Sequence, residues 1–341
     1  MGFVSIDDKL FFFERNFFTL DGLWMIKTEK ETNWETALSI DLKVWKEFLK
    51  IIFHGLKDYL HIEGNNLFDF IKILAFRWST EGWDYDILLR NNYEVEITIK
   101  NCPYHAAMYR NEERHKKVPV ICKDVCIPLY DSLVFGFNEK IKIKRDYYKG
   151  LGDNNCNFIL TQKDLYPSDK FKEIDNLKKE AEKKGKLFYF EQNFKILDKL
   201  WIIEVRKQLN FDTTLKLDNL VWQELYEIIF KRVIKYLNIT GRNLEDLIKV
   251  LSFIWNCEGC NHEIIKRNKN EIILNIDYCL YIEVMKSITE YHDYIVSICK
   301  DWCLPYLDSA IKRFNPKIIL KRTKSIEIEN NICTFHIKLS D

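Results

Sequence analysis

Two short segments of the chain carry a pair of cysteines at the same spacing. ICKDVCIPLYDS begins at Ile121 and ICKDWCLPYLDS begins at Ile298, and each places two thiols four residues apart. Residues i and i+4 of a helix lie on one face, so the two thiols of a pair can point the same way. Thiolates gathered in this way bind zinc or iron–sulfur clusters, and a single activated thiolate acts as a nucleophile.

The two segments belong to an internal duplication. LFFFERNFFTLDGLW, from Leu10, returns as LFYFEQNFKILDKLW, from Leu187, an offset of 177 residues (187 − 10). The same offset carries Tyr59 to Tyr236 without a gap. Self-similarity at a fixed offset identifies repeated structural units.

The repeats divide the chain of 341 residues into three parts. We predict a first repeat at 1–164, a charged helical linker at 165–186 and a second repeat at 187–341. Two like domains joined in this way favour a pseudo-dimer within the chain.

The offset also pairs eight of the ten cysteines. The pairs are Cys102 with Cys279, Cys122 with Cys299, Cys126 with Cys303, and Cys156 with Cys333. Four thiols from three separate elements can form a tetrahedral zinc site or hold an iron–sulfur cluster. Two alternatives stay open: the cysteines are small apolar core residues inherited with the fold, or one of them is a nucleophilic or redox thiol.

A proline follows each helical cysteine pair. Pro128 cannot lie in a helix interior without removing a hydrogen bond and causing a clash. It can instead lie in the first turn of a new helix, which places Cys126 near a helix N-terminus, where a thiolate is favoured.

The segment CEGCNH, from Cys257, occurs only in the second repeat. Its two thiols, Cys257 and Cys260, have the CxxC spacing that suits metal or redox chemistry, with His262 close by. If this pair is functional, the two repeats are unequal.

Histidines and aspartates recur beside the cysteine pairs. His115 and His292 precede the thiols by a spacing that shares a helix face, and either could act as a metal ligand or as a base beside a thiol. Asp131 and Asp308, about one helical turn beyond the thiols, are the carboxylates best placed to activate water in a hydrolase. Packed histidines and solvated aspartates are the structural alternative.

The order of predicted elements is the same in both repeats. In the first, apolar spacing predicts helices near 45–60 and 67–78, followed by a hairpin, a further helix to about 135 and a second hairpin. We therefore predict an α+β fold of two homologous domains. Each has an N-terminal helical half and a four-stranded antiparallel sheet made of two hairpins with an intervening helix.

Each repeat resembles the L-2-amino-thiazoline-4-carboxylic acid hydrolase-like family. The similar features are a cysteine that ends a strand, a helix bearing cysteine and aspartate, an FN segment that opens the last hairpin, and a closing Cys-x-Phe. The order of elements is also similar to the vinyl-reductase domain and to transport-particle (TRAPP) subunits. The resemblance implies an α+β fold, a small-molecule ligand bound near cysteines, and ring-opening hydrolysis of a thiazoline-like substrate.

The composition narrows the classes of function and of partner that the chain can have. The formal net charge is +1, which gives no global reason to expect nucleic acid or an anionic membrane as partner. No phosphate-cradling motif occurs, and the N-terminus is neither a signal peptide nor a spanning helix. We expect a cytoplasmic protein with reduced thiols that binds a cluster or zinc and binds or hydrolyses a small sulfur-containing heterocycle. The alternative is a ligand-binding or assembly module with inert core cysteines.

Overall fold

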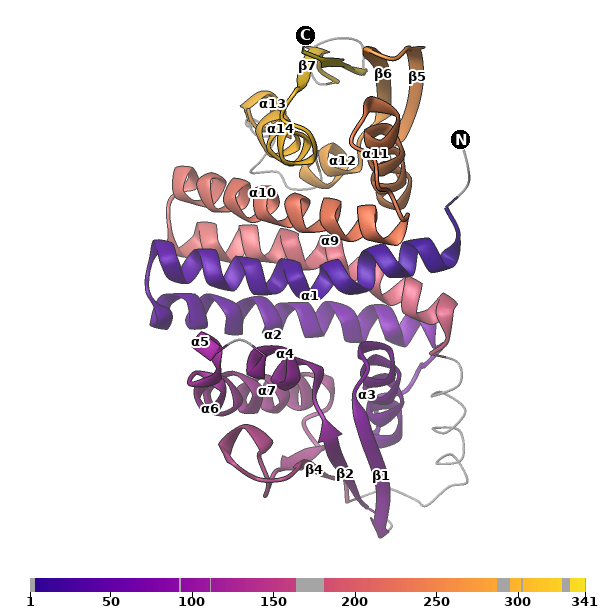
Figure 1. The fold of residues 1–341 in the computed structure, drawn as a ribbon. Coiled ribbons are helices and arrows are strands. Elements are labelled where there is room, and N and C mark those ends of the chain that lie inside the picture. The colour runs from indigo at the N-terminus through magenta and orange to yellow at the C-terminus, as the bar shows by residue number, and fades with distance from the viewer. Residues whose placement is uncertain are drawn as a thin grey trace. The chain divides into compact units, whose positions relative to one another are not determined.

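The computed structural model describes residues 4–91, 93–110, 112–163, 181–286, 295–301, 303–326 and 332–340. These residues form two compact units (Figure 1). Unit 1 comprises residues 1–31 and 205–341, and unit 2 comprises residues 32–204. Each unit therefore contains the first helix of one repeat and the remaining elements of the other repeat. The predicted linker lies mostly outside the described residues.

Unit 2 holds the body of the first repeat and most of the first helix of the second. Its elements are α2 (Trp34–Tyr59), α3 (Leu67–Glu81), β1 (Asp84–Asn91), β2 (Glu94–Asn101), α4 (Pro103–Tyr109), α5 (Glu112–His115), α6 (Val118–Val120), the π-helical turn Ile121–Cys126, α7 (Ile127–Phe137), β3 (Lys142–Lys144), the 3-10 turn Lys149–Leu151, β4 (Cys156–Thr161) and α9 (Lys183–Gln208). The last residues of α9 cross into unit 1.

Unit 1 holds the first helix of the chain and the body of the second repeat. Its elements are α1 (Ile6–Glu31), α10 (Phe211–Tyr236), α11 (Leu244–Glu258), β5 (Asn261–Arg267), β6 (Glu271–Tyr278), α12 (Leu280–Lys286), α13 (Ile295–Asp301), α14 (Cys303–Phe314), β7 (Ile318–Lys324) and β8 (Cys333–Leu339).

The third helix of each repeat is fixed at both ends by local sequence. The Asn66 side chain accepts hydrogen bonds from the Phe68 and Asp69 N–H groups, and the Asp69 carboxylate closes a capping box. The helix ends at Gly82, whose φ of 82° is readily adopted only by glycine. On α11, the Asn243 side chain accepts a hydrogen bond from the Asp246 N–H, and Gly259 (φ 78°) ends the helix.

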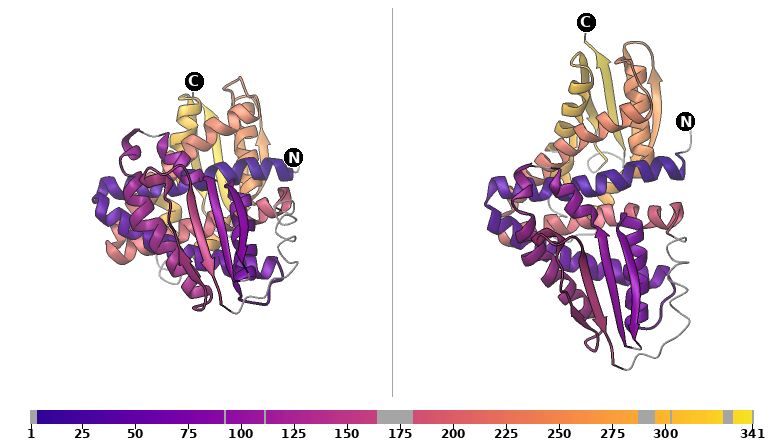
Figure 2. Two further views of the ribbon diagram at one scale, coloured as in Figure 1. Left: turned by 90° about the horizontal axis from the view of Figure 1, so that it is seen from below. Right: turned by 60° about the horizontal axis from the view of Figure 1, so that its bottom comes forward.

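Each unit contains a four-stranded antiparallel sheet, ordered β1-β2-β4-β3 in unit 2 and β5-β6-β8-β7 in unit 1. Trp78 of α3 and Tyr130 of α7 both pack on Phe158 of β4, with ring centroids 5.3 and 4.8 Å apart. The helices α3 and α7 thus cover the same face of the sheet (Figure 2). The predicted α+β class, with two hairpins and intervening helices in each repeat, is confirmed.

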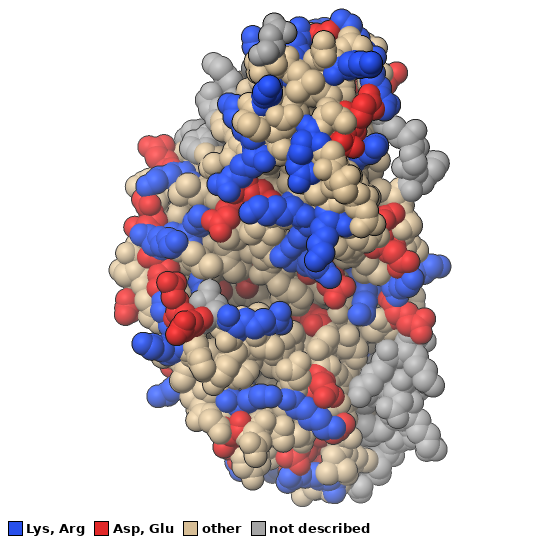
Figure 3. Space-filling view, viewed as in Figure 1, with Lys and Arg blue, Asp and Glu red and all other residues tan. Residues whose placement is uncertain are grey.

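The surface carries charges of both signs. On the face drawn in Figure 3, Lys and Arg side chains lie among Asp and Glu side chains, as a net charge of +1 leads one to expect. Within the described part of the chain, no helix is both long and apolar enough to cross a membrane.

Candidate functional site

Strand register places the first and last cysteines of the first repeat at one end of the sheet. β2 ends directly before Cys102, and β4 begins at Cys156, which pairs with Ile99 of β2. Because antiparallel strands run in opposite directions, the end of β2 lies beside the start of β4. Cys102 is also the N-cap of α4, where its sulfur accepts a hydrogen bond from the His105 N–H (3.5 Å).

The two helical cysteines lie on the π-helical turn. This turn joins α6 to α7, and Cys126 occupies the N-cap position of α7. Pro128 lies in the first turn of α7. Of the two positions considered from the sequence, this is the one that starts a new helix. A proline ring crowds the carbonyl four residues before it, and a wider turn gives that carbonyl room. Single π turns of this kind are frequent at functional sites.

The 3-10 turn Lys149–Leu151 presents backbone donors to two of the sulfurs. The Lys149 N–H donates to Cys156 Sγ at 3.2 Å, and the Gly150 N–H donates to Cys122. Gly150 is buried, and a Cβ atom built on it would lie 2.1 Å from Cys122 Sγ. Hydrogen bonds to a sulfur favour its thiolate form, so this turn is suited to charged sulfur.

Arg145 is the cation at the first thiol cluster, which we define as Cys102, Cys122, Cys126 and Cys156. Its Nη1 donates to Cys126 Sγ at 3.2 Å, and its Nε donates to the Asn157 carbonyl at 3.1 Å. The guanidinium also lies over the ring of Phe158, 4.2 Å from the centroid. A positive charge is therefore held against the sulfurs from the sheet side.

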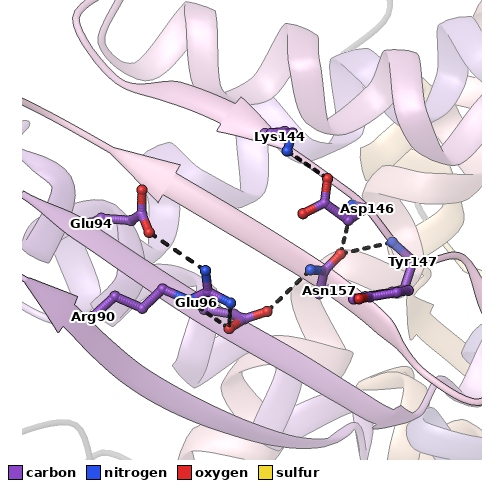
Figure 4. A network of polar contacts seen from close by, with 7 residues as sticks. All are labelled: Arg90, Glu94, Glu96, Lys144, Asp146, Tyr147 and Asn157. Atoms are coloured by element: carbon purple, nitrogen blue, oxygen red, sulfur yellow. Dashed lines mark hydrogen bonds and ion pairs between the residues drawn. The ribbon is translucent and has the colours of Figure 1, made fainter.

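A polar network anchors the segment that carries Arg145 and the 3-10 turn (Figure 4). Asn157, which is 2% exposed, accepts hydrogen bonds from the backbone N–H groups of Asp146 (2.8 Å) and Tyr147 (3.0 Å). Its Nδ2 donates to Glu96 (3.1 Å), which also pairs with Arg90. Since Asn157 directly follows Cys156, the network fixes the loop relative to the thiols.

The thiols of this cluster influence one another. Burial raises the pKa of Cys102, Cys122 and Cys156, and that of Cys122 reaches about 12. Charge on Cys126 raises all three further, while Arg145 lowers the pKa of Cys122 and Cys156. Without a bound cation, Cys102, Cys122 and Cys156 keep their protons at neutral pH.

The second repeat builds a similar arrangement in unit 1, with its arginine on the other cysteine of the helical pair. Cys333 opens β8 opposite Ile276 and accepts a hydrogen bond from the Ile326 N–H at 3.2 Å, the offset equivalent of the contact between Lys149 and Cys156. Arg322, the equivalent of Arg145, places Nη1 3.6 Å from Cys299 Sγ. We call Cys279, Cys299, Cys303 and Cys333 the second thiol cluster.

In the second thiol cluster, the pKa of Cys279, of Cys303 and of Cys333 is raised above the ordinary thiol value. Burial, followed by the neighbouring Cys279 and Cys299, raises the pKa of Cys303 to about 12. A hydrogen bond with Cys299 is the largest cause of the raised pKa of Cys333, and burial adds to it. The hydroxyl of Tyr306 lies 3.7 Å from Cys303 Sγ and can donate to it.

The cysteines of the CEGCNH segment lie in different surroundings. Gly259, between them, ends α11 in a left-handed conformation, so the chain reverses direction there. Cys257 lies 3.9 Å from the Asp8 carbonyl of α1. Cys260 instead hydrogen-bonds Cys279, and this contact is the largest cause of the raised pKa of Cys279. The second thiol cluster therefore has a fifth sulfur beside it.

The predicted histidines and aspartates lie apart from this arrangement. His115 is exposed at the end of α5, where its ring contacts Tyr109 (centroids 3.8 Å apart), and a turn separates it from the helical cysteines. His292 lies outside the described residues. Asp131 is exposed on α7, and Asp308 pairs with Lys312 at 2.5 Å on α14.

Two sets of residues were missed at the sequence level. Arg145 and Arg322 recur at the repeat offset, but the alternating basic pattern around them was interpreted as the solvent-exposed face of a strand. Glu81 lies buried in an ion pair with Arg77 (3.0 Å), with side-chain exposures of 0% and 2%. Its equivalent, Glu258, accepts a hydrogen bond from Tyr281 at 2.7 Å. The recurrence of glutamate at positions 81 and 258 was the one sign in the sequence that this carboxylate has a structural or functional role.

A single metal ion and an iron–sulfur cluster make different demands on four cysteine sulfurs. Among the described residues, no three His, Cys, Asp or Glu side chains are arranged to hold a single metal ion. A tetrahedral zinc site with Zn–S bonds of about 2.3 Å draws its sulfurs to about 3.8 Å from one another. A cluster spreads its four thiolates further, because its own iron and sulfide atoms lie between them.

Comparison with known proteins gives a partial match. Residues 6–146 match a family of unknown function (DUF6125). No curated protein and no solved structure matches the chain.

Proposed function

We propose that each unit binds an iron–sulfur cluster, with zinc as the alternative metal, through the four cysteines of its thiol cluster. The ligands in unit 2 are Cys102, Cys122, Cys126 and Cys156, and those in unit 1 are Cys279, Cys299, Cys303 and Cys333. All ten cysteines are free thiols, which suits the reducing cytoplasmic compartment expected for this chain.

One observation carries the proposal. Two kinds of donor recur in both units. A backbone N–H at position 149 or 326 donates to the last cysteine of the cluster, and an arginine at position 145 or 322 contacts one member of the helical pair, Cys126 in unit 2 and Cys299 in unit 1. Neutral, inert core thiols need neither donor, because their burial is favourable without a hydrogen bond. Four thiolates around a divalent zinc ion, or around a cluster, leave excess negative charge that a nearby arginine offsets.

Anaerobic purification followed by elemental analysis and an absorption spectrum tests the proposal. We expect iron and acid-labile sulfide in equal amounts with a broad visible absorption, or zinc in a colourless protein. Cys126→Ala and Cys303→Ala should each remove about half of the bound metal, since each affects one unit. Folded protein that takes up neither metal after reconstitution would contradict the proposal.

A second candidate is a small-molecule-binding or assembly module whose thiols only fill the core. The raised pKa values and the lack of a ready single-ion site among the described residues favour it. Alkylation distinguishes the two candidates. Inert core thiols react at the same slow rate with or without a chelator, whereas metal ligands are protected by the metal and react faster once a chelator strips it.

Two further expectations stay predictions. Ring-opening hydrolysis of a thiazoline-like substrate rests on the family resemblance, and replacing Asp131, Asp308, His115 and His292 in a turnover assay tests it. A pseudo-dimer of the two repeats is supported by the composition of the units, each of which contains elements of both repeats.

A further inference from the structure

The first helices of the two repeats dock in equivalent ways. Phe11 of α1 stacks on Tyr236 of α10, with ring centroids 3.9 Å apart and an interplanar angle of 14°. Phe188 of α9 stacks on Tyr59 of α2, at 4.1 Å and 16°. Both members of the two pairs are related by the repeat offset (188 − 11 and 236 − 59 are both 177). Each first helix therefore contacts the second helix of the other repeat.

Polar contacts in unit 1 fix the same partnership. Lys27 of α1 forms an ion pair with Glu224 of α10 at 2.5 Å. Arg232 of α10 donates to Asn16 Oδ1 of α1 at 2.7 Å. Glu224 has a counterpart in the first repeat, Glu47 on α2 (224 − 177), so the sequence alone does not decide between the two partners for Lys27.

In unit 2, the exchanged helix delivers a side chain to a buried network. Tyr189 of α9 is fully buried and donates its hydroxyl proton to Glu81. Glu81 also accepts hydrogen bonds from Arg77 Nε (3.0 Å) and Trp83 Nε1 (2.8 Å). The carboxylate that orients Arg77 is thus held partly by the second repeat.

The network continues from Arg77 to the first thiol cluster. Arg77 Nη1 (3.2 Å) and Trp78 Nε1 (2.9 Å) both donate to the hydroxyl oxygen of Tyr130. With both lone pairs of that oxygen engaged, its own proton is available to a third group. Tyr130 lies four residues after Cys126 on α7, so the two side chains share a helix face.

We propose that the two first helices are exchanged between the repeats and that α9 completes the first thiol cluster. Tyr189 acts as a positioning residue: through Glu81 and Arg77 it fixes Tyr130, whose hydroxyl donates to the Cys126 sulfur or to a group bound there. We call this chain of contacts from Tyr189 to Tyr130 the relay. The equivalents of Tyr189 and Tyr130 in unit 1 are Phe12 and Leu307, which carry no hydroxyl, so the second thiol cluster lacks the relay. The relay rests on the proposed thiolate site, whereas the helix exchange does not depend on that site.

Zero-length carbodiimide cross-linking of the intact monomer tests the exchange. It joins an ammonium to a carboxylate in direct contact, and peptide mass spectrometry then identifies the pair. We expect Lys27 linked to Glu224. A link from Lys27 to Glu47 in its place overturns the exchange, because that product requires α1 to pack on its own repeat.

The rate of Cys126 alkylation in metal-free protein, measured at one pH, tests the relay. Tyr189→Phe removes one hydroxyl, and we expect Cys126 alkylation to slow by at least about threefold. Tyr130→Phe should give the same effect, and the double variant no more than either alone. Cys303 in unit 1 is the internal control and should keep its rate.

An unchanged Cys126 alkylation rate in Tyr189→Phe, with only a lower unfolding free energy, overturns the relay and leaves Tyr189 a purely structural residue. Because this readout needs no metal, its failure is separate from a failure of the cluster proposal, which elemental analysis decides.

Discussion

Gly150 lies directly against the Cys122 sulfur: a Cβ atom at position 150 would be 2.1 Å from Sγ and 2.8 Å from the cysteine Cβ. Contacts this short force the turn or the π-helical segment to move. We predict that Gly150→Ala lowers the free energy of unfolding by about 1–3 kcal/mol, the usual cost of overpacking. It should also reduce metal uptake in unit 2, since the backbone donor at position 150 moves with the turn.

The matched control for that substitution is Gly136→Ala. Gly136 lies on α7, and apart from its chain neighbours and the backbone of its own helix nothing lies within 4 Å of a Cβ built there. Alanine is the better helix former by about 1 kcal/mol, so this variant should be equally or more stable and should keep its metal. Chemical denaturation and elemental analysis measure both effects, and equal behaviour of the two variants contradicts a special role for Gly150.

The sequence predicted the repeated fold well because its signals are local. Asn66 and Gly82 mark the ends of α3 by side-chain capping and a left-handed backbone, and both recur at the repeat offset. The thiol clusters were partly predictable, because the order of cysteines along strand, helix and strand is visible in the chain. The roles of Arg145 and Gly150 were not, since they depend on how a loop folds back over the thiols.

The helix exchange is invisible to sequence for a physical reason. Phe11 can stack equally well on Tyr59 or on Tyr236, since both positions carry tyrosine. A repeat comparison identifies equivalent positions but not which copy supplies them. Only the three-dimensional arrangement, with Phe11 on Tyr236, distinguishes the two cases.

The buried ion pair in unit 2 should be sensitive to loss of one member. Arg77→Met leaves the Glu81 carboxylate buried without its guanidinium partner, and breaking a buried pair in this way typically costs about 3–5 kcal/mol. Adding Glu81→Gln should recover part of that loss, because it removes the uncompensated charge. Urea unfolding of the two variants measures this, and a loss below about 1 kcal/mol for Arg77→Met would contradict the buried pair.

The two cysteines of the CEGCNH segment should respond differently to substitution. The hydrogen bond from Cys260 is the largest cause of the raised pKa of Cys279, so Cys260→Ala should lower that pKa and speed Cys279 alkylation at a fixed pH. Cys257→Ala is the control, because Cys257 contacts the Asp8 carbonyl instead. Peptide mass spectrometry after timed alkylation measures the Cys279 rate in both variants. Equal rates in the two variants would contradict a separate role for the contact between Cys260 and Cys279.

The metal-free protein should lose stability in alkaline solution. The pKa of Cys122 and of Cys303 is raised to about 12 in the folded protein, chiefly by burial, whereas an unfolded thiol titrates near about 8.5. Below the unfolded value both states keep the proton, so the stabilising contribution is complete. Between the two values the unfolded chain has lost protons that the folded protein retains, so the free energy of unfolding falls as pH rises.

Urea unfolding of metal-free protein at about pH 8 and about pH 10.5 measures this slope. Cys122→Ala and Cys303→Ala should each flatten it by at most about 1.4 kcal/mol per pH unit, the value for one proton, and by less where solvent reaches the half-buried sulfur. Other groups that titrate in this range, such as lysines and tyrosines, contribute equally to parent and variant, so the difference isolates the thiol. Slopes that do not change in either variant would mean that these sulfurs ionise as freely in the folded protein as in the unfolded chain.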